Sequence, residues 1–319
     1  MKRYLVIMLF LSIFITTGCD TKNYMVCTTS YPIEYLIQRI GSDKITTCNI
    51  SSDTVIQVAS IVEDYESKLE DSDILFQING MEPYFELYAQ DIQSHQSNYV
   101  DLATFGHFYN FNRYTMSNVN GVSKLRESVY YEGDIFKDIN TYTKDPFLWM
   151  DPLMMLSSAE KICDYLINEY PEYENEFLAN YNELEIDLTN LDAQYQTIKD
   201  NKNKNISFVS ITPSFGNWQN TFGIQVYPVI LSKYGALPSE NQLDIIKQKI
   251  IDDHVQYIAH EQNLTPEMEN LYNQFVEELK LIPIELSNLS SLSKIEQEKN
   301  QDYLTIMYEN FKVLESIGN

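Results

Sequence analysis

Apolar residues recur along this chain with two spacings, and the spacings alternate over two long stretches. From Tyr24 to about Tyr99, short strand-like apolar segments alternate with segments whose apolar residues recur every three or four positions. The same alternation returns between about Ile206 and Leu286. Because strands that alternate with helices form parallel sheets with crossover helices, each stretch predicts an α/β lobe.

Specific segments carry this pattern. In the first lobe we expect strands and helices in the order 24–29, 30–41, 44–50, 62–71, 72–80, 81–92 and 98–102. In the second lobe we expect them in the order 206–211, 215–223, 224–230, 239–254, 255–261, 265–280 and 281–286, followed by a terminal helix at 301–317. Residues 103–143 are rich in Asn, Tyr, Gly and Ser without clear periodicity, which predicts a long surface loop or a small irregular excursion.

Two helical stretches separate the lobes. The first covers residues 156–170, and Pro171 begins a longer one that runs to about Asp200 with one apolar face. At about 1.5 Å per residue this helix is roughly 43 Å long, enough to follow both lobes. The predicted fold class is therefore α/β, with two lobes, each a mostly parallel sheet flanked by helices, joined by one long spine helix with the ligand cleft between the lobes.

The N-terminus has the features of a secretory signal. Two basic residues precede about 14 residues of apolar character, which are fewer than the roughly 20 that a membrane-spanning helix needs. Cys19 follows Gly18 directly and resembles the cysteine of a bacterial lipobox, although Thr16 replaces the usual leucine. The predicted organisation is a signal peptide at 1–18, a lipid-anchored linker at 19–23, an N-terminal lobe at 24–156, a spine-helix region at 157–204 and a C-terminal lobe at 205–319.

The composition excludes one class of partner. The chain holds 46 acidic and 22 basic side chains, for a formal net charge of −24. Such a field repels nucleic acid and anionic lipid headgroups. We therefore expect no nucleic-acid partner, and contact with the membrane only through the lipid on Cys19.

Besides Cys19, three cysteines remain in the mature chain, in an oxidising compartment. Cys27 and Cys48 fall in two apolar segments that could be neighbouring strands, and Cys163 lies in a helical one. The sequence has no Cys-x-x-Cys pair of the kind that binds metal. We expect all three to be core thiols, and the sequence leaves their pairing open.

Six segments in order carry a family resemblance. They are VCTTSYPIEYLIQRIGSDKI, SDILFQINGMEPY, DPFLWMDP, the spine helix, SFGNW and DYLTIMYENFKVL. With the lipobox they make the chain similar to solute-binding lipoproteins of the zinc and manganese class of ABC importers. The resemblance implies an extracytoplasmic lipoprotein that works with ABC permease and ATPase subunits. It also implies a protein that is not an enzyme, and the sequence has no nucleophile elbow, phosphate loop or His-Glu-x-x-His motif.

In that family four side chains hold the metal between the lobes, and the resemblance places them on specific residues here. The matching positions are Gln57, Phe147, Thr212 and either Ser287 or Asn288. Amides, hydroxyls and a phenyl ring replace the expected imidazoles and carboxylates, which are the donors that zinc and manganese prefer. We therefore predict a degenerate site that binds zinc or manganese weakly or binds another small solute in an uncharged pocket with one aromatic wall.

Other interpretations of the polar residues remain open. A relocated metal site of His260, Glu261 and Glu285 is an alternative to a solvated surface histidine. Asp145 and Asp151, each before a proline, are expected to start turns or helices rather than to act in catalysis, and Trp149 is expected to pack at the lobe junction. The alternative function is a non-transport surface lipoprotein, an adhesin or scaffold, on the same fold.

Overall fold

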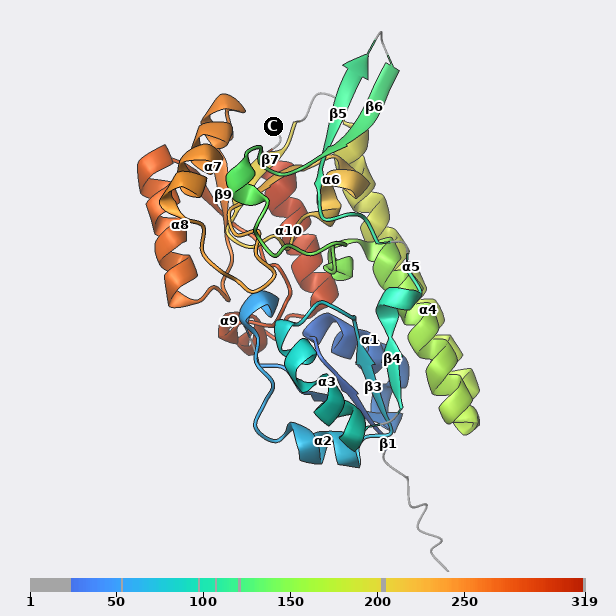
Figure 1. The fold of residues 1–319 in the computed structure, drawn as a ribbon. Helices are drawn as coiled ribbons and strands as arrows, with labels where there is room; N and C mark the ends of the chain where they lie inside the picture. Colours follow the sequence, from blue (N-terminus) through green and yellow to red (C-terminus); the bar gives the residue numbers. More distant parts are fainter. Residues whose placement is uncertain are drawn as a thin grey trace, which may run out of the picture.

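The computed structural model places two α/β lobes one above the other along a pair of long helices (Figure 1). The structure describes residues 24–52, 54–96, 98–106, 108–119, 122–201 and 205–317. The predicted signal peptide, Cys19 and His107 lie outside the described residues. Within the described part, no helix is long and apolar enough to cross a membrane.

The N-terminal lobe is built on a parallel four-stranded sheet in the order β2-β1-β3-β4. Its strands are β1 (Tyr24–Thr28), β2 (Ile45–Asn49), β3 (Ile74–Gln77) and β4 (Tyr99–Asp101). Its helices are α1 (Tyr31–Gly41), α2 (Tyr65–Asp71) and α3 (Pro83–His95). Both α1 and α3 carry a proline in the first turn, where the missing N–H costs no helical hydrogen bond.

The C-terminal lobe repeats this plan with a parallel sheet in the order β10-β9-β7-β8. Its strands are β7 (Ser207–Ser210), β8 (Gln225–Pro228), β9 (Tyr257–His260) and β10 (Ile282–Glu285). Its helices are α6 (Asn217–Phe222), α7 (Glu240–Asp252), α8 (Pro266–Leu279), α9 (Lys294–Glu298) and α10 (Tyr303–Ile317). The short helix α9 is the one element of this lobe that the periodicity does not predict.

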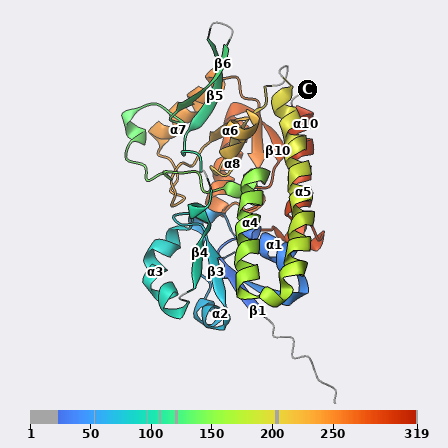
Figure 2. The same ribbon diagram turned by 90° about the vertical axis from the view of Figure 1, so that its right-hand side faces the viewer.

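The lobes share a stiff connection made by α4 (Pro152–Glu169) and α5 (Glu174–Asp200). A turn of 3-10 helix at Pro171–Tyr173 joins them, so α5 begins three residues later than predicted. Helix α5 packs against α1 of the first lobe and α10 of the second, and Figure 2 shows it running along both. One hydrophobic core continues from lobe to lobe around it, which confirms the predicted α/β fold with a spine helix.

A disulfide corrects the prediction for two of the cysteines. Cys27 of β1 and Cys48 of β2 are directly opposite each other in the parallel register and are bonded, with their Cα atoms 4.4 Å apart. The expectation that both are free core thiols is therefore wrong, because it did not use the register of the two strands. Cys163 is a buried free thiol, as predicted.

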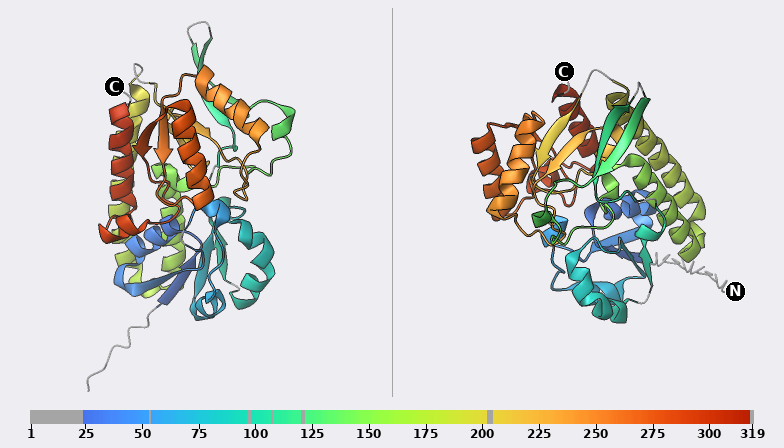
Figure 3. Two further views of the ribbon diagram at one scale, coloured as in Figure 1. Left: turned by 90° about the vertical axis from the view of Figure 1, so that its left-hand side faces the viewer. Right: turned by 45° about the horizontal axis from the view of Figure 1, so that its top comes forward.

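A β-hairpin corrects the prediction of an irregular segment at 103–143. Strand β5 (Arg113–Val119) pairs antiparallel with β6 (Val122–Ser128), and the hairpin projects from the C-terminal lobe, away from the first lobe (Figure 3). The available sequence signal is the Asn-Gly pair at 120–121, which is typical of two-residue hairpin connections. Strand β6 is exposed throughout, and the buried residues of β5, Arg113 and Tyr114, are consecutive, so neither strand shows the alternation from which periodicity predicts a strand.

Candidate functional site

The segment Asp145-Pro146-Phe147-Leu148-Trp149-Met150-Asp151-Pro152 passes between the lobes, and its two aspartates fix its ends. The Asp145 carboxylate accepts a hydrogen bond from the backbone N–H of Phe147 at 3.0 Å. Asp151 is the N-cap of α4, where it accepts from the N–H groups of Leu153 and Met154 and from the Thr221 hydroxyl. The structural role predicted for both aspartates agrees with these contacts.

Phe147 is fully buried in an aromatic wall. Its ring lies edge-on to Tyr142 and Trp149, with centroids 5.7 and 5.4 Å away. Its carbonyl oxygen accepts a hydrogen bond from the Asn217 side chain at 2.7 Å. Trp149 donates its indole N–H to the carbonyl of Asn288 at 2.8 Å, so it packs at the lobe junction as predicted. Phe147 therefore supplies packing and no metal donor at the position that the resemblance assigns to a histidine.

Thr212 and Asn288 meet at one buried carboxylate, that of Glu261. The Thr212 hydroxyl donates to it at 2.5 Å and the Asn288 amide at 2.7 Å. The backbone N–H groups of Ile211 and Thr212 donate to its other oxygen at 3.1 and 3.0 Å. Burial raises the pKa of Glu261, and the hydrogen bonds from Thr212 and Asn288 oppose that rise.

The other two positions that the resemblance assigns to metal ligands, Gln57 and Ser287, have different surroundings. Gln57 lies in a 3-10 turn after β2, is buried, and has neither amide atom hydrogen-bonded to a described residue. Ser287 is half-buried and exchanges two backbone hydrogen bonds with the Asn310 side chain. Thr212 and Asn288 are thus brought together by Glu261, whereas Ser287 is tied to α10.

A second buried carboxyl group, that of Glu82, lies in the first lobe, and the sequence analysis did not single it out. Glu82 follows β3 and occupies the N-cap position of α3 without a side-chain cap bond. It is fully buried, and neither of its oxygens has a hydrogen-bond partner of good geometry among the described residues. Burial raises its pKa to about 8, and the nearby Thr29 hydroxyl, although it makes no hydrogen bond of good geometry, opposes that rise. The structure thus has two buried glutamates near the expected positions: Glu261, predicted only as an alternative ligand, and Glu82. The uncharged pocket stays a prediction. A glutamate just beyond the carboxyl end of a parallel strand was the signal available.

The alternative ligand set does not converge on one point. His260 is partly exposed, its Nδ1 lies 3.1 Å from Glu285 and its Nε2 lies 3.3 Å from Glu269. Glu261, its neighbour in sequence, instead binds Thr212. In the described ranges no group of three or more His, Cys, Asp or Glu side chains is arranged to hold a metal ion.

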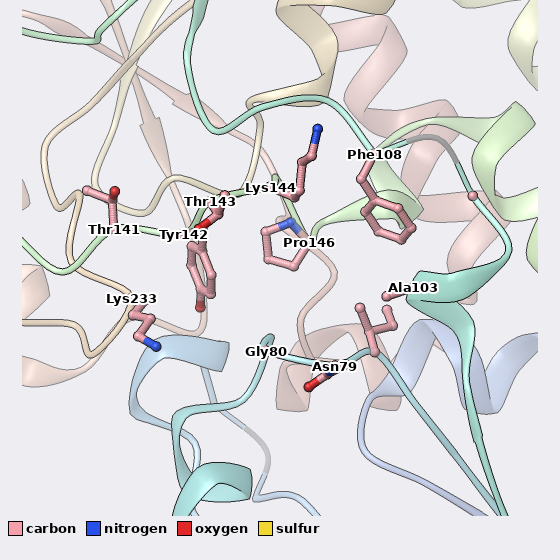
Figure 4. A pocket seen from close by; sticks show the side chains of 12 residues that line it. Asn79, Gly80, Ala103, Phe108, Thr141, Tyr142, Thr143, Lys144, Pro146 and Lys233 are labelled. Atoms are coloured by element: carbon pink, nitrogen blue, oxygen red, sulfur yellow. The ribbon is translucent and has the colours of Figure 1, made fainter.

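A pocket of about 420 Å³ opens between the lobes beside the aromatic wall. In Figure 4 Asn79, Gly80 and Ala103 face Tyr142 and Pro146 across it. Its residues are Ile78, Asn79, Gly80, Ala103, Gly106, Phe108, Thr141, Tyr142, Thr143, Lys144, Pro146 and Lys233. The Tyr142 hydroxyl donates to the carbonyl of Met81 at 3.0 Å, so the pocket wall is anchored to the loop that carries Glu82.

A clamp joins the two lobes at the rim of this pocket. Lys233, in the loop after β8, pairs with Glu86 of α3 at 2.7 Å, and the Tyr234 hydroxyl donates to the other oxygen of Glu86 at 3.1 Å. The next residue, Gly235, has φ of +65°, and a Cβ atom there would lie 2.6 Å from the Val58 side chain. The backbone of this C-terminal loop therefore lies directly on the turn that carries Gln57.

Comparisons with known proteins agree with this architecture. The zinc-binding protein AdcA of Streptococcus pyogenes serotype M18 is 28% identical over 171 residues, 53% of this chain and 32% of that protein. The high-affinity zinc uptake system protein ZnuA of Bacillus subtilis is 23% identical over 174 residues, 54% of this chain and 53% of that protein. The matched part of the chain thus spans between about a third and about a half of these relatives.

Solved structures match over nearly the whole chain. A crystal structure of ZnuA has a TM-score of 0.71 at 12% identity and covers 93% of this chain and 100% of its own. The laminin-binding protein Lmb of Streptococcus agalactiae has a TM-score of 0.71 at 17% identity, with 92% and 98% covered. At these identities the likeness concerns the fold.

A family model described as zinc-uptake complex component A, periplasmic, matches residues 26–317. Members of that family are components of zinc uptake and not enzymes, in agreement with the prediction from the sequence. From this match, the chain belongs to the ZnuA family of zinc-uptake components.

Proposed function

We propose that this protein is a lipid-anchored extracytoplasmic solute-binding subunit of an ABC importer whose inherited metal site is degenerate. It would work with a permease and an ATPase and carry either a weakly bound zinc or manganese ion or another small solute. The family match supports the importer role. The lipid anchor rests on Cys19 and on a pneumococcal relative named zinc-binding lipoprotein AdcA.

The observation that carries the degenerate site is the fully buried ring of Phe147. A phenyl ring cannot coordinate a metal, and its aromatic neighbours leave it no room to turn aside. The Thr212 hydroxyl and the Asn288 amide nitrogen already donate hydrogen bonds to Glu261. At the four positions that the resemblance assigns to ligands, a zinc ion would exchange its water shell for neutral partners, which is an unfavourable exchange.

Zinc titration of the mature chain by calorimetry, together with measurement of metal in the purified protein, tests this proposal. We expect no tight stoichiometric zinc. The variant carrying Gln57→His, Phe147→His, Thr212→His and Ser287→Asp should gain zinc binding in the micromolar range or tighter, which corresponds to about 8 kcal/mol. Tight zinc in the unaltered protein would refute the degenerate site. A lack of gain in the variant would show that the assignment of these four positions is wrong.

An adhesin or scaffold on the same fold is the second function that an observation favours. The exposed hairpin carries Met116, Val122 and Leu125 on its surface, together with the exposed basic residues Lys124 and Arg126. The structural neighbour Lmb is described as a bifunctional protein with adhesin and metal transporting activity. If the hairpin acts in adhesion, replacing Lys124 and Arg126 with glutamine should reduce attachment of cells to surfaces without changing solute uptake. If this variant instead lost solute uptake and kept normal attachment, the result would favour a role in import without a role in adhesion.

A further inference from the structure

At the carboxyl edge of the first sheet, buried side chains carry polar atoms without hydrogen-bond partners among the described residues. Besides the hydroxyl of Ser30 at the N-cap of α1, four side chains do so, through the hydroxyl of Thr29, both amide atoms of Gln57, the amide oxygen of Gln77 and both carboxyl oxygens of Glu82. All four side chains are at least nine-tenths buried. Because buried polar groups in folded proteins nearly always have partners, such a concentration calls for a bound species that satisfies them.

The sheet topology places these groups at the point where bound ligands are expected. In the order β2-β1-β3-β4 the chain runs from β1 to β2 on one side and then returns to β3 on the other. The crevice beyond the carboxyl ends of β1 and β3 is thus a topological switch point. Thr29 follows β1, Gln77 ends β3 and Glu82 lies in the turn beyond it. Gln57 follows the adjacent strand, β2.

The balance of donors and acceptors favours a cation. The unpartnered atoms of the four side chains comprise five oxygens and one nitrogen, and two of the oxygens belong to a carboxyl group. Within the described part of the chain, no ion pair includes Glu82, and Lys233, the cation at the nearby pocket rim, binds Glu86. An ionised carboxylate without a counter-charge is strongly disfavoured in a buried site.

Size and charge then narrow the class of ligand. None of the four side chains lines the 420 Å³ pocket between the lobes, and all are at least nine-tenths buried, which favours an ion over an organic molecule. Oxygen-only donor sets suit hard cations and not zinc, which prefers nitrogen and sulfur. A single carboxylate neutralises a single positive charge, whereas a divalent ion would leave a net charge buried.

We propose that Glu82, Gln77, Gln57 and Thr29 form a site for a monovalent alkali cation at the switch point of the N-terminal lobe. The Glu82 carboxylate supplies the counter-charge, and the amide and hydroxyl oxygens replace the hydration shell. Gln57 is shared with the positions that the resemblance assigns to the metal in the cleft, whereas Glu82, Gln77 and Thr29 are not among them. Substitution of Glu82 therefore tests the alkali site apart from the proposed function.

Thermal unfolding of the mature chain in NaCl or KCl, against N-methyl-D-glucamine chloride at equal ionic strength, tests the proposal. We expect one of the two alkali ions to raise the unfolding midpoint in a saturable way, as binding to the folded state requires. Glu82→Gln should weaken that ion's apparent affinity about tenfold or more. Glu70→Gln, an exposed glutamate of α2, should respond as the unaltered protein does.

Three results would overturn the proposal. The first is an equal midpoint in all three salts, which would mean that water or a proton satisfies these groups. The second is a saturable alkali effect that survives Glu82→Gln. The third is a stronger response to Mg²⁺ or Mn²⁺ than to either alkali ion at the same concentration. Anomalous scattering from thallium(I) in a crystal gives a readout without any substitution, and density in the crevice between β1 and β3 is the expected result.

Discussion

Replacing Asp145 with asparagine should remove part of the dependence of stability on pH. The Asp145 side chain is buried and receives one hydrogen bond, from the N–H of Phe147. Burial raises its pKa from 3.8 to about 7, and that hydrogen bond lowers it only partly. The folded protein therefore holds a proton on this group more tightly than the unfolded chain does.

The sign and size of the effect follow from these two pKa values. The contribution of Asp145 to stability is fully present below about pH 4, falls as the pH rises toward 7, and is lost above that. A pKa difference of about three corresponds to roughly 4 kcal/mol at about 1.4 kcal/mol for each unit. Asparagine resembles the neutral acid in shape and keeps an acceptor for the Phe147 N–H. Asp145→Asn should thus match the unaltered protein near pH 4 and exceed its stability at pH 8 by up to about 4 kcal/mol.

Urea unfolding at pH 4.5, 6 and 8 measures this difference, with the fluorescence of the buried Trp149 and Trp218 as the signal. The other buried carboxyls contribute equally to both proteins, so the difference between the two isolates Asp145. Asp134→Asn, an exposed position whose side chain pairs with Lys137, is the matched control and should show no such trend. A variant less stable than the unaltered protein at pH 8 would mean that the ionised carboxylate stabilises the fold, and the reasoning would fail.

Two further predictions concern the disulfide and the clamp between the lobes. Serine at both Cys27 and Cys48, which are 21 residues apart, should lower the free energy of unfolding by about 3 kcal/mol, measured by urea unfolding. Peptide mapping without reductant should recover the two cysteines linked, and separate peptides would contradict the pairing. Lys233→Met should leave that free energy within about 1 kcal/mol, because the partner Glu86 is half exposed. It should nevertheless speed hydrogen exchange of the backbone amides at residues 231–238 severalfold, and unchanged exchange would show that the clamp does not hold the loop.

Much of the fold could be predicted from local periodicity, because helix and strand spacing is written into neighbouring residues. The helix from Pro171 to Asp200 differs from α5 by one turn only, since Pro171 starts a 3-10 turn that leads into it. Periodicity did not predict the hairpin at 113–128, because β6 is exposed throughout and the buried residues of β5, Arg113 and Tyr114, are consecutive rather than alternating. The disulfide escaped because a pair of cysteines is defined by strand register and not by spacing.

For the candidate site, the sequence assigned individual residues, and the structure added their surroundings. Phe147 was assigned from the motif, and the structure adds its enclosure by Tyr142 and Trp149. The sequence analysis placed Glu82 inside the predicted helix 81–92 without a role and named Glu261 as an alternative ligand, yet both lie in the interior. Burial of a carboxyl depends on residues far away in the chain, such as Thr212 and Asn288 on Glu261.

The sequence by itself determined the order and class of the elements, the acidic surface and the lack of an imidazole at position 147, since each of these depends on residue identity and local spacing. The tertiary structure alone decided which polar groups meet, which carboxyls lose contact with water and which cysteines face each other. These outcomes depend on how the two sheets and the spine helix pack, and packing is a property of contacts between distant parts of the chain.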